Sequence, residues 1–336
     1  MGYRIEAIEW NKCEQTADSF YKDNKYLTPY SRYSFLSIIK NSANIHRLKE
    51  SFRYKFRCYE LIKENSVIMI IPLMVSEKDK LIRLAGDFSS VGHLDFLYDK
   101  DISGNDFKEM LRLLGMIYPQ YTLKLNRISE FSLTFGFLRD MYEFTEKDIC
   151  VKIDLTDYDQ WYSGLKKNCR QNIRTSYNRL NTDNRKMQFY CFVKQKPDKK
   201  LWNDNIKLFA KRILEHTKLS GLFQIPMYLL KKGETLTRAL YCDKDIFFSS
   251  VYIENTLAAS CNGVVANDGR AIITRLSINT SMARYSPGGL LINEVIKECC
   301  AKYPFIKSID LSRGDEPYKY TYGGTEHFNY SYEIKL

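Results

Sequence analysis

The sequence predicts an α/β protein of two domains, each built on a mixed β-sheet. Length is the first indication, because 336 residues exceed the ~100 to 200 residues of an average domain. The order of hydrophobic patterns is the second, since strand-like alternation gives way to helical spacing in both halves of the chain. The content of 44% hydrophobic residues is ample for two buried cores. We place the boundary near Cys150, which gives domains at 1–150 and 151–336.

The first half alternates between strand-like and helical patterns. Two hydrophobic runs flank Glu64-Asn65-Ser66 and are expected to form a hairpin. A helix separates the later strands. The predicted elements, in order, are a helix at Tyr33–Asn41, strands at Arg53–Glu64, Val67–Ser76, Leu81–Ala85 and Leu94–Tyr98, a helix at Asp106–Ile117 and a strand at Tyr121–Leu125.

The second half repeats this order, so the two halves are expected to be weak structural copies. Both combine a hairpin with a further strand, a helix and another strand. The predicted elements are a helix at Tyr158–Leu180, a strand at Met187–Lys194, helices at Leu201–Lys218 and Met227–Arg238, a hairpin at Ile246–Val265, a strand at Ala271–Ile278, a helix at Leu290–Lys302 and a strand at Lys307–Arg313.

The most informative segment lies at residues 277–324. The strand Ala271–Ile278 is followed by a break at Tyr285-Ser286-Pro287-Gly288-Gly289 and then by the helix Leu290–Lys302. The first N–H groups of a helix lack intrahelical partners, and the helix dipole adds partial positive charge there. A glycine-rich helix start is therefore suited to a pyrophosphate. Taken alone, a Gly-Gly turn also fits an ordinary helix start.

A second polar group follows the next predicted strand. Gly314–Lys319 places two carboxylates, a phenol and an amine just beyond that strand. The glycine-rich loop and this ionisable cluster are therefore expected on neighbouring strands. Alternation with Ile309 and Leu311 predicts that Asp310 faces away from their side of the sheet.

Basic residues exceed acidic ones by 51 to 40, and the net charge of +11 favours anionic ligands. The excess is concentrated between Lys166 and Thr182, where five basic residues occur without an acid. Lys166, Arg170 and Arg174 are spaced at i, i+4 and i+8, which places them along one helix face. This stripe is either a solvated face or a phosphate-binding surface.

Several other classes of protein fit the composition less well. Nine cysteines at irregular spacing, without Cys-x-x-Cys, predict buried thiols in a reducing compartment. Only four scattered histidines occur, so no metal site is expected. No run reaches the ~20 apolar residues of a membrane span, and Met1–Asn24 lacks the apolar region of a secretory signal, so a cytoplasmic location is expected. The abundant aromatic residues are spread through predicted core segments, which disfavours a nucleic-acid-binding module.

The C-terminal motifs resemble those of the GNAT acyltransferases, in particular the CelD-like branch, whose relatives include the Fem-type peptidoglycan aminoacyltransferases. The specific pieces are SPGGLL at Ser286–Leu291 and DLSRGDEPYKY at Asp310–Tyr320. Lys166–Arg174 is similar to the basic helix of the family, and Thr28-Pro29-Tyr30 to its N-terminal turn. The resemblance implies tandem GNAT-like domains, in which 151–336 binds acyl-CoA and 1–150 serves the acceptor side without a cofactor.

The resemblance also implies where the donor, expected to be acetyl-CoA, binds. Its pantetheine follows the strand Ala271–Ile278, and Tyr318 is the general acid that protonates the leaving thiolate. The strand Arg270–Thr280 offers no carboxylate where the family usually keeps its base, which leaves Asp310 and Asp315 as catalytic candidates. The residues expected to hold the donor are Leu276, Ile278, Arg284, Ser286, Gly288, Gly289 and Leu290.

Residues from both halves are candidates for binding the acceptor. In the first half, the loop Asp99–Asp106 corresponds to the glycine-rich loop, and its three aspartates would repel a pyrophosphate. This half is therefore expected to have lost cofactor binding. The residues expected to contact the acceptor or its phosphates are Arg170, Arg174, Lys319, His93 and Asp95.

The function implied by the resemblance is transfer of an acyl group from acyl-CoA to an amino group. The acceptor implied is a nucleotide-linked or lipid-linked amino sugar in surface-polysaccharide assembly, with peripheral membrane contact in the lipid-linked case. The alternative within enzymes is a Fem-like aminoacyl-tRNA-dependent transferase. Against it, no long heptad-patterned insertion typical of a coiled-coil arm is present. Acyl-chain length, acceptor identity and oligomeric state remain open.

Overall fold

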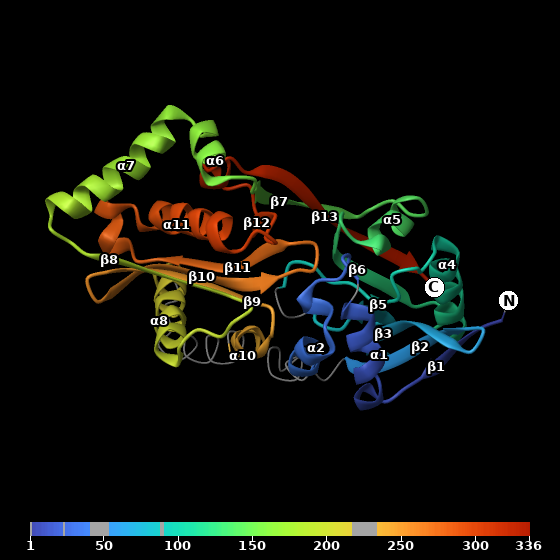
Figure 1. Cartoon of the computed structure of the whole chain (residues 1–336). Helices are drawn as coiled ribbons and strands as arrows, with labels where there is room; N and C mark the ends of the chain where they lie inside the picture. The colour runs from blue at the N-terminus through green and yellow to red at the C-terminus, as the bar shows by residue number, and fades with distance from the viewer. Residues whose placement is uncertain (1, 23, 41–53, 88–90, 217–233) are drawn as a thin grey trace. The chain divides into compact units, whose positions relative to one another are not determined.

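The computed structural model describes residues 2–22, 24–40, 54–87, 91–216 and 234–336. The chain divides into two compact units, which are described in turn. Unit 1 comprises residues 1–149 and 328–336, and unit 2 comprises residues 150–327. Figure 1 shows the strands and helices of each unit along the chain.

Unit 1 is built on a mixed sheet with strand order β1-β2-β3-β4-β6-β13. β1, β2, β3 and β4 run antiparallel to one another in this order. β6 runs parallel to β4, and the part of β13 from Asn329 onwards runs antiparallel to β6. β5 pairs with β3 outside this path. The strands are β1 (Tyr3–Ala7), β2 (Lys55–Lys63), β3 (Ser66–Ser76), β4 (Leu81–Leu84), β5 (Leu97–Tyr98), β6 (Thr122–Ser129) and β13 (Thr325–Lys335).

The helices of unit 1 include α4, which connects the parallel strands β4 and β6. It packs against α5 and β1, and its buried side chains include Phe107, Met110 and Leu114. The helices are α1 (Glu14–Lys22), α2 (Tyr33–Lys40), α4 (Gly104–Ile117) and α5 (Leu133–Arg139), with 3-10 turns η1 (Trp10–Lys12) and η2 (Pro29–Ser31).

Unit 2 repeats this plan. β8, β9, β10 and β11 are antiparallel neighbours, β12 runs parallel to β11, and β7 runs antiparallel to β12. α11 connects the two parallel strands, as α4 does in unit 1. The strands are β7 (Glu146–Asp154), β8 (Met187–Val193), β9 (Ile246–Ile253), β10 (Thr256–Val265), β11 (Arg270–Ile278) and β12 (Ser308–Arg313).

Helices cover both faces of the unit 2 sheet. Figure 1 shows α6, α7 and α11 on one face and α8 and α10 on the other. The bounds are α6 (Tyr158–Gly164), α7 (Lys167–Thr182), α8 (Lys199–His216), α10 (Glu234–Cys242), η5 (Thr280–Tyr285), α11 (Pro287–Lys302) and α12 (Pro317–Thr321).

The repeated plan confirms the predicted α/β class with mixed sheets and two GNAT-like folds. In unit 1 the parallel pairing covers Leu81–Arg83 and Thr122–Lys124, and in unit 2 it covers Arg270–Ile272 and Ser308–Asp310. The C-terminal limit of the second domain differs from the predicted 151–336, because residues 328–336 belong to unit 1. The free edge of β6 needs a partner strand, and β13 supplies it, just as β7 covers β12.

Two predicted helices also differ from the structure. The expected helix Tyr158–Leu180 is interrupted at Leu165 and Lys166, whose extended ψ values of 149° and 145° separate α6 from α7. Most of the expected helix Met227–Arg238 lies outside the described residues, and α10 begins at Glu234. The strand β13 was not predicted, because its polar and aromatic residues give no long apolar alternation.

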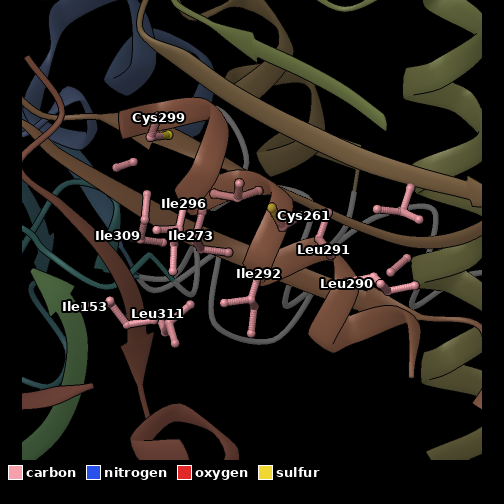
Figure 2. Close-up of a cluster of buried hydrophobic side chains, with 14 of the residues drawn as sticks. Ile153, Cys261, Ile273, Leu290, Leu291, Ile292, Ile296, Cys299, Ile309 and Leu311 are labelled. Carbon is pink, nitrogen blue, oxygen red and sulfur yellow. The ribbon is translucent and has the colours of Figure 1, made fainter. Parts of the chain in front are cut away.

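The core of unit 2 lies between α11 and the sheet. Figure 2 shows Leu290, Leu291, Ile292, Ile296 and Cys299 of α11 packed with residues of four strands. Burying one such side chain contributes about 1.5 to 3 kcal/mol, so this cluster fixes α11 on β10, β11 and β12. All nine cysteines are free thiols and most are buried, which confirms the prediction. The strand partners labelled in Figure 2 are Ile153, Cys261, Ile273, Ile309 and Leu311.

A register shift between β10 and β11 depends on glycine. The shift falls at Asn262 and Gly263, where a Cβ added to Gly263 would lie 1.8 Å from the carbonyl oxygen of Ile272. We expect Gly263→Ala to lower the free energy of unfolding by about 2 to 4 kcal/mol, because the two backbones must separate. Chemical denaturation measures the change.

The matched control is Gly136→Ala in α5, where an added Cβ meets no atom within 4 Å. Alanine there should stabilise the protein by about 0.5 to 1 kcal/mol, since glycine is a poor helix former. Equal effects of the two substitutions would contradict the close-contact role of Gly263.

Candidate functional site

The parallel strands β11 and β12 separate after a short paired stretch. Their ladder ends at Ile272 and Asp310, although β11 continues to Ile278. β12 bends here, because Ser312 has a left-handed φ of 58° and its hydroxyl donates to the carbonyl of Ile273 at 2.7 Å. The final residues of β11 therefore have no ladder partner on the β12 side. A flexible thioester arm could hydrogen-bond to such an edge.

The N-terminus of α11 lies directly beside the end of β11. A Cβ added to Gly288 would lie 2.6 Å from Cδ1 of Ile278, so the end of the Ile278 side chain would have to shift to admit it. Ser286 precedes the helix with a left-handed φ of 47° and makes no side-chain cap. The N–H groups of Gly289 and Leu290 donate to the carbonyl of Ser286. The dipole and the uncapped first turn favour an anion at this position.

The neighbouring glycine has a structural role that the sequence did not reveal. A Cβ added to Gly289 would lie 2.4 Å from the hydroxyl of Tyr322. Burial raises the pKa of Tyr322 to about 12, so this phenol remains neutral. The absence of a side chain at Gly289 therefore leaves room for the hydroxyl of Tyr322 as well as for a ligand at the start of α11.

The corresponding helix start in unit 1 is closed by its own side chains. Ser103 and Asp106 form a capping box at the N-terminus of α4. Burial opposes ionisation of Asp106, but hydrogen bonds from Ser103, Tyr3 and Lys63 outweigh it and lower its pKa to about 2. The carboxylate of Asp106 thus already occupies the position at the start of α4 where an anion would bind. This is a stronger reason against phosphate binding than the predicted repulsion by three aspartates.

Arg284 lies beside the start of α11 but is already paired. Its guanidinium donates to Asp183 at 2.8 and 3.1 Å, and Tyr285 donates to the same carboxylate. Arg179 of α7 in turn donates to the carbonyl of Arg284. These contacts fasten the end of α7 to η5, so Arg284 first serves to position the loop.

The basic stripe of α7 divides into structural and free cations. Arg170 donates to the carbonyls of Ser163 and Leu165, and it thereby closes the break between α6 and α7. Arg174 is exposed, and its guanidinium makes no hydrogen bond or ion pair with a described residue. Lys166 is exposed as well. Arg174 and Lys166 are therefore the members of the predicted stripe that are available to a ligand.

Tyr318 lies on α12, with 39% of the residue exposed. Burial of its phenol raises its pKa, the charge of Glu316 raises it further, and the guanidinium of Arg212 lowers it. The phenol is therefore protonated at neutral pH and can donate a proton. The charge of Cys261, which pairs with Leu276 across β10 and β11, raises the pKa of Tyr318 further.

Arg212 was not predicted from the sequence. It extends from α8 and donates to the carbonyl of Leu276, near the point where β11 leaves β12. It also lowers the pKa of both Tyr318 and Glu316. A lone arginine in a lysine-rich helix gives no sequence signal of this position. Arg212 therefore adds a cation to the predicted site.

The ammonium of Lys319 is enclosed by backbone carbonyls, and its predicted contact with an acceptor stays a prediction. Only 2% of its side chain is exposed, and its ammonium donates to the carbonyls of Ser312, Arg313 and Gly314. It also pairs with Glu316 at 2.9 Å. Lys319 thus holds the turn between β12 and α12, since it satisfies carbonyls that no strand pairs.

The two candidate carboxylates differ in access. Asp310 is fully buried, and it accepts a hydrogen bond from the N–H of Ser312. Arg270 and His327 lie 3.4 and 3.1 Å from its carboxylate. Asp315 is exposed. Asp310 therefore has the surroundings of a structural carboxylate, and Asp315 is the one that can exchange protons with solvent.

His93 and Asp95 lie in a buried polar cluster of unit 1. Nδ1 of His93 is 3.1 Å from the amide oxygen of Asn329. Asp95 accepts hydrogen bonds from Thr134 and Tyr98. Burial outweighs these bonds and raises the pKa of Asp95 to about 7. Both residues are buried within unit 1, and their predicted contact with an acceptor stays a prediction.

The described residues contain neither a cluster suited to a metal ion nor a helix suited to crossing a membrane. No group of three or more His, Cys, Asp or Glu side chains within them could hold a metal ion. In the same part of the chain, no helix has the length and apolar character required to cross a bilayer.

Comparison with known proteins identifies the fold. Residues 167–320 match the family described as acetyltransferase (GNAT) domain. Among curated proteins, none matches the sequence. The matched segment includes α7, the separated strands, the start of α11 and Tyr318.

Solved structures resemble the chain over nearly its whole length. FemX has a TM-score of 0.63 at 10% identity and covers 99% of this chain and 97% of its own. The C-terminal domain of a putative lysylphosphatidylglycerol synthetase from Agrobacterium fabrum has a TM-score of 0.56 at 9% identity. L-PGS from Bacillus licheniformis has a TM-score of 0.53 at 11% identity. The last two each cover 96% of this chain and 91% of their own. These similarities show a shared fold.

The role of Lys319 can be tested by Lys319→Met, which keeps the apolar stem and removes the ammonium. Three carbonyls then lose their donor, so the free energy of unfolding should fall by about 2 to 4 kcal/mol in chemical denaturation. Lys302→Met is the control, because Lys302 pairs with Glu298 at the surface and should change stability by less than ~0.5 kcal/mol. Unchanged stability of Lys319→Met would favour a ligand-binding role.

Proposed function

We propose that this chain, whose residues 167–320 match the acetyltransferase (GNAT) domain family, transfers an acyl group from acyl-CoA to the amino group of an amino sugar. Acetyl-CoA is the proposed donor. The proposed acceptor is nucleotide-linked or lipid-linked and serves surface-polysaccharide assembly. A lipid-linked acceptor would bring the protein into peripheral contact with a membrane.

The separation of β11 from β12 beside the uncapped start of α11 carries this proposal. The edge of β11 up to Ile278 is proposed to offer the pantetheine arm the backbone groups that remain beside the carbonyl of Leu276, which Arg212 binds. Gly288 and Gly289 are proposed to admit the diphosphate. Ser286 and Leu290 flank the same turn. Capping of α4 supports donor binding in unit 2 alone. The acceptor role of unit 1 remains part of the proposal and rests on this contrast.

The residues near the separated strands fit acyl transfer. A neutral amine attacks the thioester carbonyl, the C–S bond breaks, and the departing thiolate takes a proton. Tyr318 is protonated at neutral pH and is the proposed donor of that proton. Arg212 supplies positive charge beside the same strands. Asp315 is the proposed carboxylate for removing the proton of the amine, directly or through water.

A second candidate is Fem-type aminoacyl transfer. The similarity of fold to FemX over 99% of this chain favours it. The longest described helix, α8, has 18 residues, so the described part of the chain contains no coiled-coil arm. Both candidates place an activated acyl group at unit 2, and they differ in whether CoA or tRNA carries that group.

The test is to incubate the purified chain with acetyl-CoA and longer acyl-CoAs and to follow free thiol with and without amino sugars. Amine-dependent thiol release supports the proposal. Transfer from aminoacyl-tRNA without thiol release from any acyl-CoA would favour the Fem-type candidate. The absence of both activities would contradict both candidates.

The role of Tyr318 is tested by Tyr318→Phe, which keeps the ring and removes the proton. Loss of a general acid should lower kcat by ~100- to 10,000-fold with little change in donor affinity. Asp315→Asn and Asp310→Asn are measured beside it, and only the first is expected to slow the amine's deprotonation. Turnover of Tyr318→Phe within about threefold of the parent would assign the phenol a structural role.

The two arginines of α7 are expected to behave differently. Arg174→Gln should raise KM for a phosphorylated ligand and reduce the salt dependence of KM, since screening weakens exposed charge contacts. Arg170→Gln should instead lower thermal stability, because two carbonyls lose their donor. Steady-state kinetics at two salt concentrations and thermal unfolding separate the roles. Identical salt dependence in Arg174→Gln and the parent would indicate a solvated face.

A further inference from the structure

The two faces of the unit 2 sheet differ in polarity. Val251, Cys261 and Leu276 lie on the α11 side, within or against the apolar core. Phe248 of β9 packs against Trp202 of α8 on the opposite side, but several of the alternate residues on that side are polar. They form the polar strip, a row of buried side chains across β9, β10 and β11 that consists of Ser250, Ser260, Asn262 and Ser277.

Strand register places these residues side by side. Ser260 is opposite Ser250 on β9 and opposite Ser277 on β11. Asn262 lies two residues beyond Ser260 on the same face. The exposed fraction of each of these four residues is 1% or less. A fully buried row of three hydroxyls and an amide is costly unless each polar atom has a partner.

Only part of this hydrogen-bonding capacity is used. Asn205 of α8 donates to the hydroxyl of Ser260 at 2.6 Å and accepts from the amide of Asn262 at 2.7 Å. The hydroxyls of Ser250 and Ser277 and the amide oxygen of Asn262 have no hydrogen-bond partner among the described residues. Three buried polar atoms thus remain unsatisfied around one contact between α8 and the sheet.

The polar strip adjoins the proposed donor site. Ser277 follows Leu276, whose carbonyl accepts from Arg212. α8 presents Asn205 and Arg212, two turns apart, to the polar strip and to the end of β11. Arg275 lies on the same face, is half-buried, and donates to Thr237 at 2.6 Å. The polar strip therefore approaches solvent at Arg275.

We propose that the polar strip binds hydroxyl groups of the acceptor, and that the acceptor is accordingly a polyhydroxylated ring amine. The inference rests on the proposed function and assigns acceptor recognition to unit 2. The unsatisfied atoms are two hydroxyls and one amide oxygen, all uncharged, so they match neutral hydroxyls better than carboxylates or phosphates. An apolar amine would leave them unsatisfied, which disfavours it.

The test measures binding without acyl-CoA, by saturation-transfer NMR on the full chain. The probes are D-glucosamine, D-galactosamine and cyclohexylamine, a ring amine that lacks hydroxyls. At least one amino sugar should bind the parent more tightly than cyclohexylamine does. Ser277→Ala and Ser250→Ala should each weaken sugar binding by about 3- to 10-fold and leave cyclohexylamine binding unchanged.

Ser249→Ala is the matched control. Ser249 neighbours Ser250 on β9 but points to the other face, where its hydroxyl donates to the carbonyl of Tyr190 at 3.0 Å. It should leave sugar binding unchanged. Sugar binding that is equal in the parent, Ser250→Ala and Ser277→Ala would overturn the proposal and leave the polar strip as a site for buried water only.

Failure of this inference and failure of the proposed function have different signatures. Binding of amino sugars that depends on the polar strip, without thiol release from any acyl-CoA, supports the polar strip and contradicts the proposed donor. Amine-dependent thiol release with no preference of the parent for amino sugars over cyclohexylamine contradicts the polar strip alone.

Discussion

The separation of two parallel strands is the constraint on which the rest of unit 2 depends. β11 and β12 pair only from Arg270 to Ile272 on one side and from Ser308 to Asp310 on the other. Several local features keep them apart: Gly263 permits the register shift beside β11, Ser312 takes a left-handed conformation, and Lys319 binds the carbonyls that follow. This arrangement is stable because backbone groups that lack a ladder partner find other hydrogen-bond partners. The result is a strand edge that a ligand can use without breaking a ladder.

The two units share a fold plan but differ at the starts of their connecting helices. Both units contain a strand, a helix and a parallel strand in the same order. α4 begins with a capping box in which Asp106 accepts hydrogen bonds from Ser103, Tyr3 and Lys63. α11 begins after a left-handed Ser286 with no side-chain cap. Partial positive charge is thus satisfied internally in unit 1 and remains available in unit 2.

The sequence predicted the elements whose periodicity and turn residues agree. The hairpin around Glu64-Asn65-Ser66, the strand Ala271–Ile278 and the helix after Pro287 follow from local patterns, and the structure contains all three. The sequence did not predict β13, which belongs to unit 1 because it pairs with β6, a strand about 200 residues earlier. Such long-range pairing has no local signature.

The candidate site shows the same limit. Backbone features such as the start of α11 were predictable, because glycine and proline restrict conformation locally. The partners of charged side chains were not. Lys319 and Arg284 looked free for a ligand in sequence, yet carbonyls and Asp183 bind them. Arg212 was overlooked because only the packing of α8 on β11 brings it to Leu276.

The contrast between the two sheet faces links stability to recognition. On the α11 face, apolar side chains fix the helix whose N-terminus is proposed to bind the diphosphate, so the position of that turn is set by a dry core. On the α8 face, buried hydroxyls and amides make fewer contacts than they could. Unsatisfied polar groups lower stability, and a fold that retains them beside the open edge of β11 keeps hydrogen-bonding capacity that an apolar face would lack. This division separates a face that positions the proposed diphosphate-binding turn from a face that retains unused hydrogen-bonding capacity.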